Sequence, residues 1–134
     1  MGGILLVGHG HFAEGLKEAV EMLCGECPQL FTACLESFDG PEQFVKKFED
    51  AYKKAEEYGD VTVFCDLMGG TPCNVAVQQL NGKEGSKLIS GVNLPMLMTF
   101  ILGNEDSETV LEESRNAILD VLSCVDSDMV ECEV

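Results

Sequence analysis

The sequence contains no long hydrophobic run. Its apolar stretches are short, and none approaches the roughly 18–20 residues that a membrane-spanning helix requires. The N-terminus also lacks the basic region and the long apolar stretch of a secretory signal peptide. These absences argue against a membrane-spanning protein and against an exported one.

Basic residues are scarce. Only 8 Lys and Arg side chains stand against 24 Asp and Glu, so the formal net charge is -16 at pH 7. Nucleic acids and anionic lipid surfaces repel a polyanion, and we therefore expect binding to neither. The charge would steer a basic protein partner toward the chain. Solubility alone would also explain it, because net charge does not define a site.

The number of cysteines is odd, which argues against a framework of disulfides. The chain has 7 of them, several inside apolar stretches such as 61–65. Without an export signal they are expected to be buried thiols in a reducing, cytoplasmic compartment. Cys24 and Cys27 have the spacing of a redox pair, but they follow a predicted helix, where the dipole opposes a thiolate. Cys73 stands near a helix start, and we interpret it as a packing residue that oxidation can reach.

A chain of 134 residues suits one domain, expected here over 1–134. Four short, near-continuous apolar runs are bounded by Gly, Asp or Pro. This pattern is typical of strands buried on both faces of a parallel sheet. The four expected strands cover residues 4–7, 30–35, 61–65 and 87–90.

Helical periods separate these strands. Apolar side chains recur at spacings of three and four over 12–23 and over 41–55. Thr71 is expected to cap a third helix with Pro72 at its first position, and a short helix is expected after Asn93. A last helix is expected to carry Val110, Leu111, Ile118, Val121 and Leu122.

The alternation of strands and helices predicts an α/β fold with a doubly wound, mainly parallel sheet. For four strands, the flavodoxin-like order 2-1-3-4 is the simplest. Ligands of such sheets bind beyond the carboxyl ends of the strands, where the strand order reverses. The loop with His9 follows the first strand and the loop that begins at Asp66 follows the third, so we expect them side by side.

Both histidines of the chain lie in the stretch ILLVGHGHFAEG, after the first strand. Gly8 and Gly10 flank His9, allow a sharp turn and leave its ring uncrowded. A neutral imidazole has one free lone pair, which can act as a nucleophile, a base or a metal ligand. Asp66 would hold the other ring nitrogen, fix the tautomer and stabilise positive charge. His11 is expected to be exposed at the helix start.

The stretch DLMGGTPCN, residues 66–74, has the composition of a small anion site. Gly69 and Gly70 precede a predicted helix, whose N–H groups and dipole favour negative charge, and the Thr71 hydroxyl adds a donor. The loop lacks the Lys and the spacing of a Walker A loop, so we expect no nucleoside triphosphate. With His9 it suits a protein that accepts and passes on a phosphoryl group. A simple turn and helix cap is the alternative interpretation.

Three motifs, VGHGHFAEGL, FCDLMGGTPCNVA and ISGVNLPML, occur in this order over about residues 3–100. They resemble the signatures of the mannose-class IIA component of the bacterial phosphoenolpyruvate-dependent sugar phosphotransferase system. The resemblance implies a doubly wound fold and a phosphocarrier without a cofactor or a metal. Such a carrier takes a phosphoryl group from the protein HPr onto a histidine and hands it to a IIB component. A membrane IIC/IID pair then moves the sugar as it is phosphorylated.

The resemblance also implies roles for individual residues. His9 matches the phosphorylated histidine, which reacts through Nε2, and Asp66 matches the carboxylate that holds the other ring nitrogen. Thr71 stands where the family has Ser or Thr near the phosphoryl group, on the turn made by Gly69 and Gly70.

Further residues match the rim of that site. Met68, Asn93 and Pro95 are expected there, the last two with a mainly structural role. Gly8 stands where Thr or Ser is frequent, and Met68 where some members carry Trp. We expect neither departure to touch the chemistry, although Met68 can alter the docking surface.

The C-terminal residues 104–134 resemble the family only loosely. In that family a C-terminal strand can cross to the partner subunit of a homodimer. The segment DMVECEV alternates as such an antiparallel strand would, and a frayed tail fits equally well. We expect a homodimer and a IIB component on a separate chain.

Two other classes of function stay open. The stretch LLVGHG also begins some small tetrapyrrole metal chelatases, but these usually need a second histidine on a distant loop, and none lies beyond residue 11. A non-catalytic regulatory module is the other alternative, which the absence of phosphate uptake would favour. The sugar is not readable here, because selectivity is expected in the membrane components.

Overall fold

A four-stranded parallel sheet forms the centre of the computed structural model, which describes residues 2–103 and 105–125. The strand order is β2-β1-β3-β4, and all three neighbouring pairs are parallel, which confirms the predicted topology. The strands are β1 (Ile4–His9), β2 (Leu30–Leu35), β3 (Thr62–Cys65) and β4 (Lys87–Ser90).

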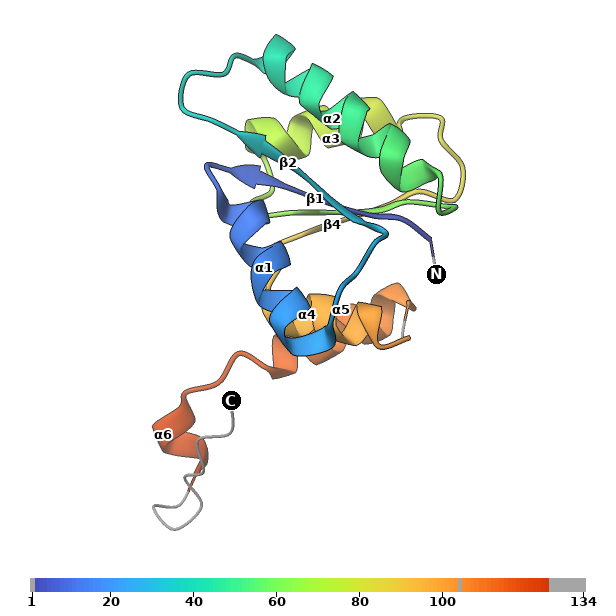
Figure 1. Ribbon diagram of the computed structural model, residues 1–134. Coiled ribbons are helices and arrows are strands. Elements are labelled where there is room, and N and C mark those ends of the chain that lie inside the picture. Colours follow the sequence, from blue (N-terminus) through green and yellow to red (C-terminus); the bar gives the residue numbers. More distant parts are fainter. Residues whose placement is uncertain (1, 104, 126–134) are drawn as a thin grey trace.

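Helices cover both faces of this sheet. Figure 1 shows α2 and α3 on one face and α1, α4 and α5 on the other, while α6 stands away from the body. Within the described residues, no helix is both long enough and apolar enough to cross a membrane. The helices are α1 (Phe12–Cys24), α2 (Pro41–Glu56), α3 (Thr71–Leu80), α4 (Leu94–Ile101), α5 (Ser107–Asn116) and α6 (Val121–Cys124).

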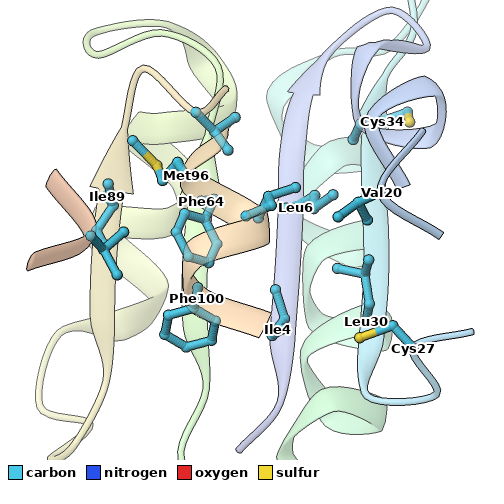
Figure 2. Packing of buried hydrophobic residues seen from close by; sticks show 14 residues of the cluster. Ile4, Leu6, Val20, Cys27, Leu30, Cys34, Phe64, Ile89, Met96 and Phe100 are labelled. Atoms are coloured by element: carbon cyan, nitrogen blue, oxygen red, sulfur yellow. The ribbon is translucent and has the colours of Figure 1, made fainter. Parts of the chain in front are cut away.

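The alternation of side chains along β1 divides the core into two layers. Ile4 and Leu6 pack against α1, α4 and α5, whereas Leu5 and Val7 pack against α2 and α3. All four side chains are buried, because β1 is a central strand with helices over both of its faces. In the first layer, the rings of Phe64 and Phe100 pack edge to face, with 5.3 Å between their centroids (Figure 2).

The strand register brings three loops to one edge of the sheet. His9, the last residue of β1, is level with Leu35, the last residue of β2. Gly10 N donates to Leu35 O at 2.8 Å, and Asp66 N donates to Val7 O at 3.2 Å. The loops that follow β1, β2 and β3 therefore begin side by side, because the carboxyl ends of parallel strands share an edge.

The prediction of one last helix was wrong. The structure has α5 and the short α6 instead, with a break over 117–120. Ile118, Val121 and Leu122, which were expected to pack, are exposed. A helix takes most of its stability from packing an apolar face, and no other described element contacts α6. The segment DMVECEV, for which a strand was considered, lies outside the described residues.

Candidate functional site

His9 and Asp66 meet at the carboxyl edge of the sheet. Asp66 Oδ2 lies 2.9 Å from the ring nitrogen Nδ1 of His9 and also accepts a hydrogen bond from the His9 backbone N at 2.9 Å. The His9 side chain is 45% exposed, whereas that of Asp66 is 14% exposed. One oxygen of a largely covered carboxylate thus holds both the backbone and the ring of an accessible histidine.

These contacts fix the tautomer of the neutral His9 ring. An ionised carboxylate only accepts hydrogen bonds, so Nδ1 must carry the hydrogen that Asp66 Oδ2 receives. The lone pair of the ring then lies on Nε2. This is the nitrogen free to act as a nucleophile.

Nε2 of His9 lies against the start of α3. A Cβ placed on Gly70 would be 2.7 Å from His9 Cε1 and 3.1 Å from Nε2, so only a residue without a side chain lets the ring lie there. Gly70 is also the N-cap residue of α3. The N-terminus of a helix carries free N–H groups and positive potential, so the site favours a negatively charged group beside Nε2.

Gly69 makes the turn that presents this helix start. Its φ is +89°, in the left-handed region that favours glycine. The side-chain amide of Asn74 donates to Gly69 O at 3.3 Å and ties the turn to the first helical residues. The expected capping role of Thr71 was wrong. Gly70 occupies that place, and Thr71 begins the helix with Pro72 second.

Gly8 lies close to the Asp66 carboxylate. A Cβ on Gly8 would lie 3.2 Å from Cγ and 3.2 Å from Oδ2 of Asp66. Gly8 therefore provides the space in which the Asp66 carboxylate lies. Its proximity could not be read from the sequence, because Gly8 in β1 and Asp66 directly after β3 meet only through the register of the two strands.

Two buried thiols lie under the same loop. Cys65 is the last residue of β3 and precedes Asp66, and Cys73 is in the first turn of α3. Burial raises the pKa of the Cys65 thiol to about 12, with a further contribution from its hydrogen bond with Cys73. Both thiols belong to the core, as expected of Cys73. All cysteines in the described part of the chain are free, including Cys24 and Cys27.

His11 is exposed at the start of α1. It is the N-cap residue of α1, its side chain is 70% exposed, and Nδ1 lies 3.3 Å from Glu14 Oε2. Its Nε2 lies 3.8 Å from Oε1 of Glu36, which follows β2. No motif in the sequence marks these two carboxylates. The acidic first helical turn was the only available signal for Glu14, and Glu36 had none.

The remaining predicted residues lie on neighbouring loops. Met68, in the turn after β3, is 79% exposed. Asn93 is the N-cap of α4, where its Oδ1 accepts from Met96 N at 2.8 Å, and Pro95 is in the first turn. Both serve the start of α4, in line with a structural role. Within residues 2–103 and 105–125, no three His, Cys, Asp or Glu side chains are placed to hold a metal ion.

Comparison with known proteins identifies the family. The profile described as the "PTS system fructose IIA component" of the mannose-type EIIA family matches residues 3–130. This chain belongs to the mannose-class IIA family of the sugar phosphotransferase system. It is a IIA component of that system, and IIA components are phosphotransfer proteins, so the family supports a phosphotransferase role.

Individual relatives agree with this assignment. The chain is 33% identical over 95 residues to the sorbose-specific EIIA component of Lacticaseibacillus casei, covering 71% of this chain and 68% of the relative. It is 32% identical over 95 residues to the fructose-specific EIIA component of Bacillus subtilis, covering 71% of this chain and 65% of that relative. The matched region thus spans about two thirds of the length of these two relatives.

A solved structure matches the whole fold. The PTS IIA protein associated with the fucose utilization operon of Streptococcus pneumoniae superimposes with a TM-score of 0.85 and 26% sequence identity. The superposition covers 92% of this chain and 96% of the other. The described elements therefore form the architecture of this family, the site lying at the carboxyl edge of its sheet.

Proposed function

We propose that this IIA component is a phosphocarrier that accepts a phosphoryl group from phospho-HPr on His9 Nε2 and passes it to a IIB component. The observation that carries the proposal is the double contact of Asp66 Oδ2 with the backbone N and Nδ1 of His9. It leaves Nε2 unprotonated and orients it beside the start of α3. We expect the exchange to occur in the cytoplasm.

The transfer needs no group beyond the chain and its partners. The Nε2 lone pair of His9 forms a bond to phosphorus while the bond between phosphorus and the donor nitrogen of HPr breaks in line. The Nδ1 hydrogen stays on His9, and the positive charge that the ring acquires lies next to the Asp66 carboxylate. The second transfer, to IIB, reverses these steps.

The helix start would stabilise the phosphoryl oxygens. The first regular hydrogen bond of α3 runs from Asn74 N to Gly70 O at 2.9 Å. Thr71 and Cys73 precede Asn74, so their N–H groups lie in the first turn, before this bonding begins. Pro72 has no N–H to offer. We assign Gly69, Gly70 and Thr71 to phosphoryl binding through backbone groups and the helix dipole.

A labelling experiment tests this function. The chain is incubated with enzyme I, HPr and radiolabelled phosphoenolpyruvate, beside the variants His9→Ala and His11→Ala. We expect the wild type and His11→Ala to take up acid-labile, base-stable label, and His9→Ala to take up none. Label of this kind on His9→Ala contradicts the assignment. No label on the wild type favours the regulatory module, and tight Co²⁺ or Ni²⁺ binding by calorimetry would favour the chelatase.

We further propose that the chain forms a homodimer through its C-terminal region. Ile118, Leu119, Val121 and Leu122 are exposed, between 59% and 86%. Figure 1 shows that this part of the chain extends away from the body. A second copy would cover these side chains and give α6 the packing partner that it lacks among the described elements.

Sedimentation equilibrium tests the homodimer. We expect the mass of two chains for the wild type and the mass of one chain for the double variant Ile118→Asp, Leu122→Asp. The double variant Met22→Asp, Leu102→Asp is the control, because it places the same charges at other exposed apolar positions. A wild type of one-chain mass at all concentrations would refute the proposal.

A further inference from the structure

Phe38 is an exposed aromatic residue on a loop that begins beside the site. It lies in the loop 36–40 between β2 and α2, and 79% of its surface is exposed. Single exposed apolar residues are common on protein surfaces and need no explanation by themselves. Its loop, however, is both fixed and placed next to His9.

Side-chain bonds hold the loop in one shape. Asp39 Oδ2 accepts from Glu36 N at 2.9 Å and from Lys47 Nζ, which also donates to Cys34 O at 3.2 Å. The Asp39 side chain is only 5% exposed. This ion pair lowers the pKa of Asp39 below its ordinary value, chiefly through the hydrogen bond from Lys47. Asp39, which follows Phe38, is therefore anchored to Glu36, directly after β2, and to Lys47 in α2.

The sheet places this loop beside the reacting histidine. Leu35, three residues before Phe38, is level with His9 in the register of β1 and β2. Figure 1 shows the connections from β1 to α1 and from β2 to α2 leaving the sheet at the same edge. His11 Nε2 and Glu36 Oε1, 3.8 Å apart, link the two loops directly.

Carboxylates lie around the loop of Phe38, and its one basic neighbour named above, Lys47, is paired with Asp39. Glu36 begins the same loop, and Glu14, with a side chain 60% exposed, lies on the facing turn of α1. Met68 lies in the turn after β3, the neighbour of β1 on its other side, and is also 79% exposed. The edge around His9 thus combines apolar side chains with carboxylates in a chain of net charge -16. A partner with an apolar patch bordered by basic side chains complements it.

We infer that Phe38 is a docking residue for the phosphoryl donor, a protein that presents an apolar patch bordered by basic side chains. The inference rests on the proposed function. The donor has to meet His9 while the Nε2 lone pair is free, which is the arrangement that the contact between Asp66 Oδ2 and Nδ1 sets up. A large aromatic side chain on a fixed loop loses little conformational entropy on binding. Such residues can therefore contribute a large share of the binding free energy of an interface. Phe38 positions the donor, and it does not touch the phosphoryl group.

Steady-state phosphorylation by phospho-HPr tests the inference. Phe38→Ala is expected to raise the KM for phospho-HPr about tenfold or more, with kcat within about twofold of the wild type. Phe38→Leu keeps an apolar contact, so its KM should lie between those of the wild type and Phe38→Ala. Met22→Ala is the control, because Met22 is 81% exposed but lies in the last part of α1, toward the other end of the sheet.

Four results test the docking role of Phe38. A KM for Phe38→Ala within twofold of the wild type overturns the inference, and so does an equal rise in Met22→Ala. A fall in kcat at unchanged KM also overturns it, because the residue would then act on the chemistry. Asp39→Asn keeps Phe38 but releases Lys47, and a KM rise in this variant shows that the fixed loop matters.

Binding without transfer separates this inference from the proposed function. Calorimetry with unphosphorylated HPr needs no phosphoryl group. If the wild type binds HPr and Phe38→Ala binds it at least tenfold more weakly, the docking residue stands even where labelling fails. If both bind equally, the docking residue is refuted even where labelling succeeds.

Discussion

Gly70 lies directly against the ring of His9. A Cβ on Gly70 would approach His9 Cε1 to 2.7 Å, closer than real Cβ atoms come to a neighbour. Gly70 itself has φ −83° and ψ 168°, an extended conformation that any residue adopts. The glycine is therefore required by the ring and not by the backbone. Gly69, the preceding residue, has the opposite property, because its φ is +89° and its Cβ would meet nothing within 4 Å.

This contrast gives a matched pair of variants. Gly70→Ala should displace the His9 ring and slow phosphorylation by about 10- to 100-fold, since displacements near 1 Å have such effects. Its stability should change little. Gly69→Ala should cost about 1–2 kcal/mol of stability through backbone strain. Urea unfolding and label uptake measure the two effects, and equal transfer by Gly70→Ala and the wild type would refute the role of the contact.

Removal of the charge on Asp66 tests the orienting contact. Asp66→Asn keeps an acceptor near Nδ1 of His9 but loses the carboxylate that stabilises the charged ring. We expect transfer to slow by about 10- to 100-fold, as for the loss of a charged hydrogen bond of about 1.5–3 kcal/mol. The urea midpoint should stay close to that of the wild type. Because the amide of Asn can also donate to an unprotonated Nδ1, nitrogen NMR should show a mixture of the two ring tautomers of His9. An unchanged rate and an unchanged tautomer would refute the role.

The two partners should compete for one face. In-line transfer to and from a single Nε2 requires each partner to cover His9 in turn. We therefore expect an excess of IIB to inhibit phosphorylation by phospho-HPr competitively, with a raised KM and an unchanged kcat. Sedimentation velocity on the three proteins together provides an independent check. A complex that contains HPr and IIB at once on one chain would contradict the prediction.

The buried thiol of Cys65 should make stability depend on alkaline pH. Its pKa is raised from 9.0 to about 12 by burial, so above pH 9 the unfolded chain releases a proton that the folded chain keeps. The contribution is complete below pH 9 and is lost as the pH rises toward 12. We expect the stability difference between the wild type and Cys65→Ala to narrow by up to about 1 kcal/mol between pH 9 and 10.5.

Urea unfolding at pH 7.5, 9 and 10.5 measures this narrowing. Cys27 and Cys34, whose pKa values burial also raises, are present in both proteins, so their effects cancel in the difference. Cys124, which is exposed, serves as a second comparison through Cys124→Ala. A constant difference between the wild type and Cys65→Ala across this range would show that the Cys65 thiol ionises equally in both states.

The sequence determined the fold because its signals are local. Apolar runs of strand length, helical periods between them and Pro or Gly at the boundaries each depend on residues close together in the chain. They predicted the four strands, the order β2-β1-β3-β4 and the neighbouring loops of His9 and Asp66. The prediction of one last helix was wrong for the same reason. Periodicity is a local signal, and it cannot show whether another element is present for Ile118 or Leu122 to pack against.

Only the tertiary structure decided how atoms meet across strands. One oxygen of Asp66 accepts from both the backbone N–H and the ring N–H of His9, and Gly8 leaves room for this carboxylate. Gly70 lies against the ring. These contacts follow from the register of β1 with β3 and from the position at which α3 begins. The place of Phe38 follows likewise from the register of β1 with β2. Such contacts join residues far apart in sequence, and a shift of a few tenths of an ångström decides them.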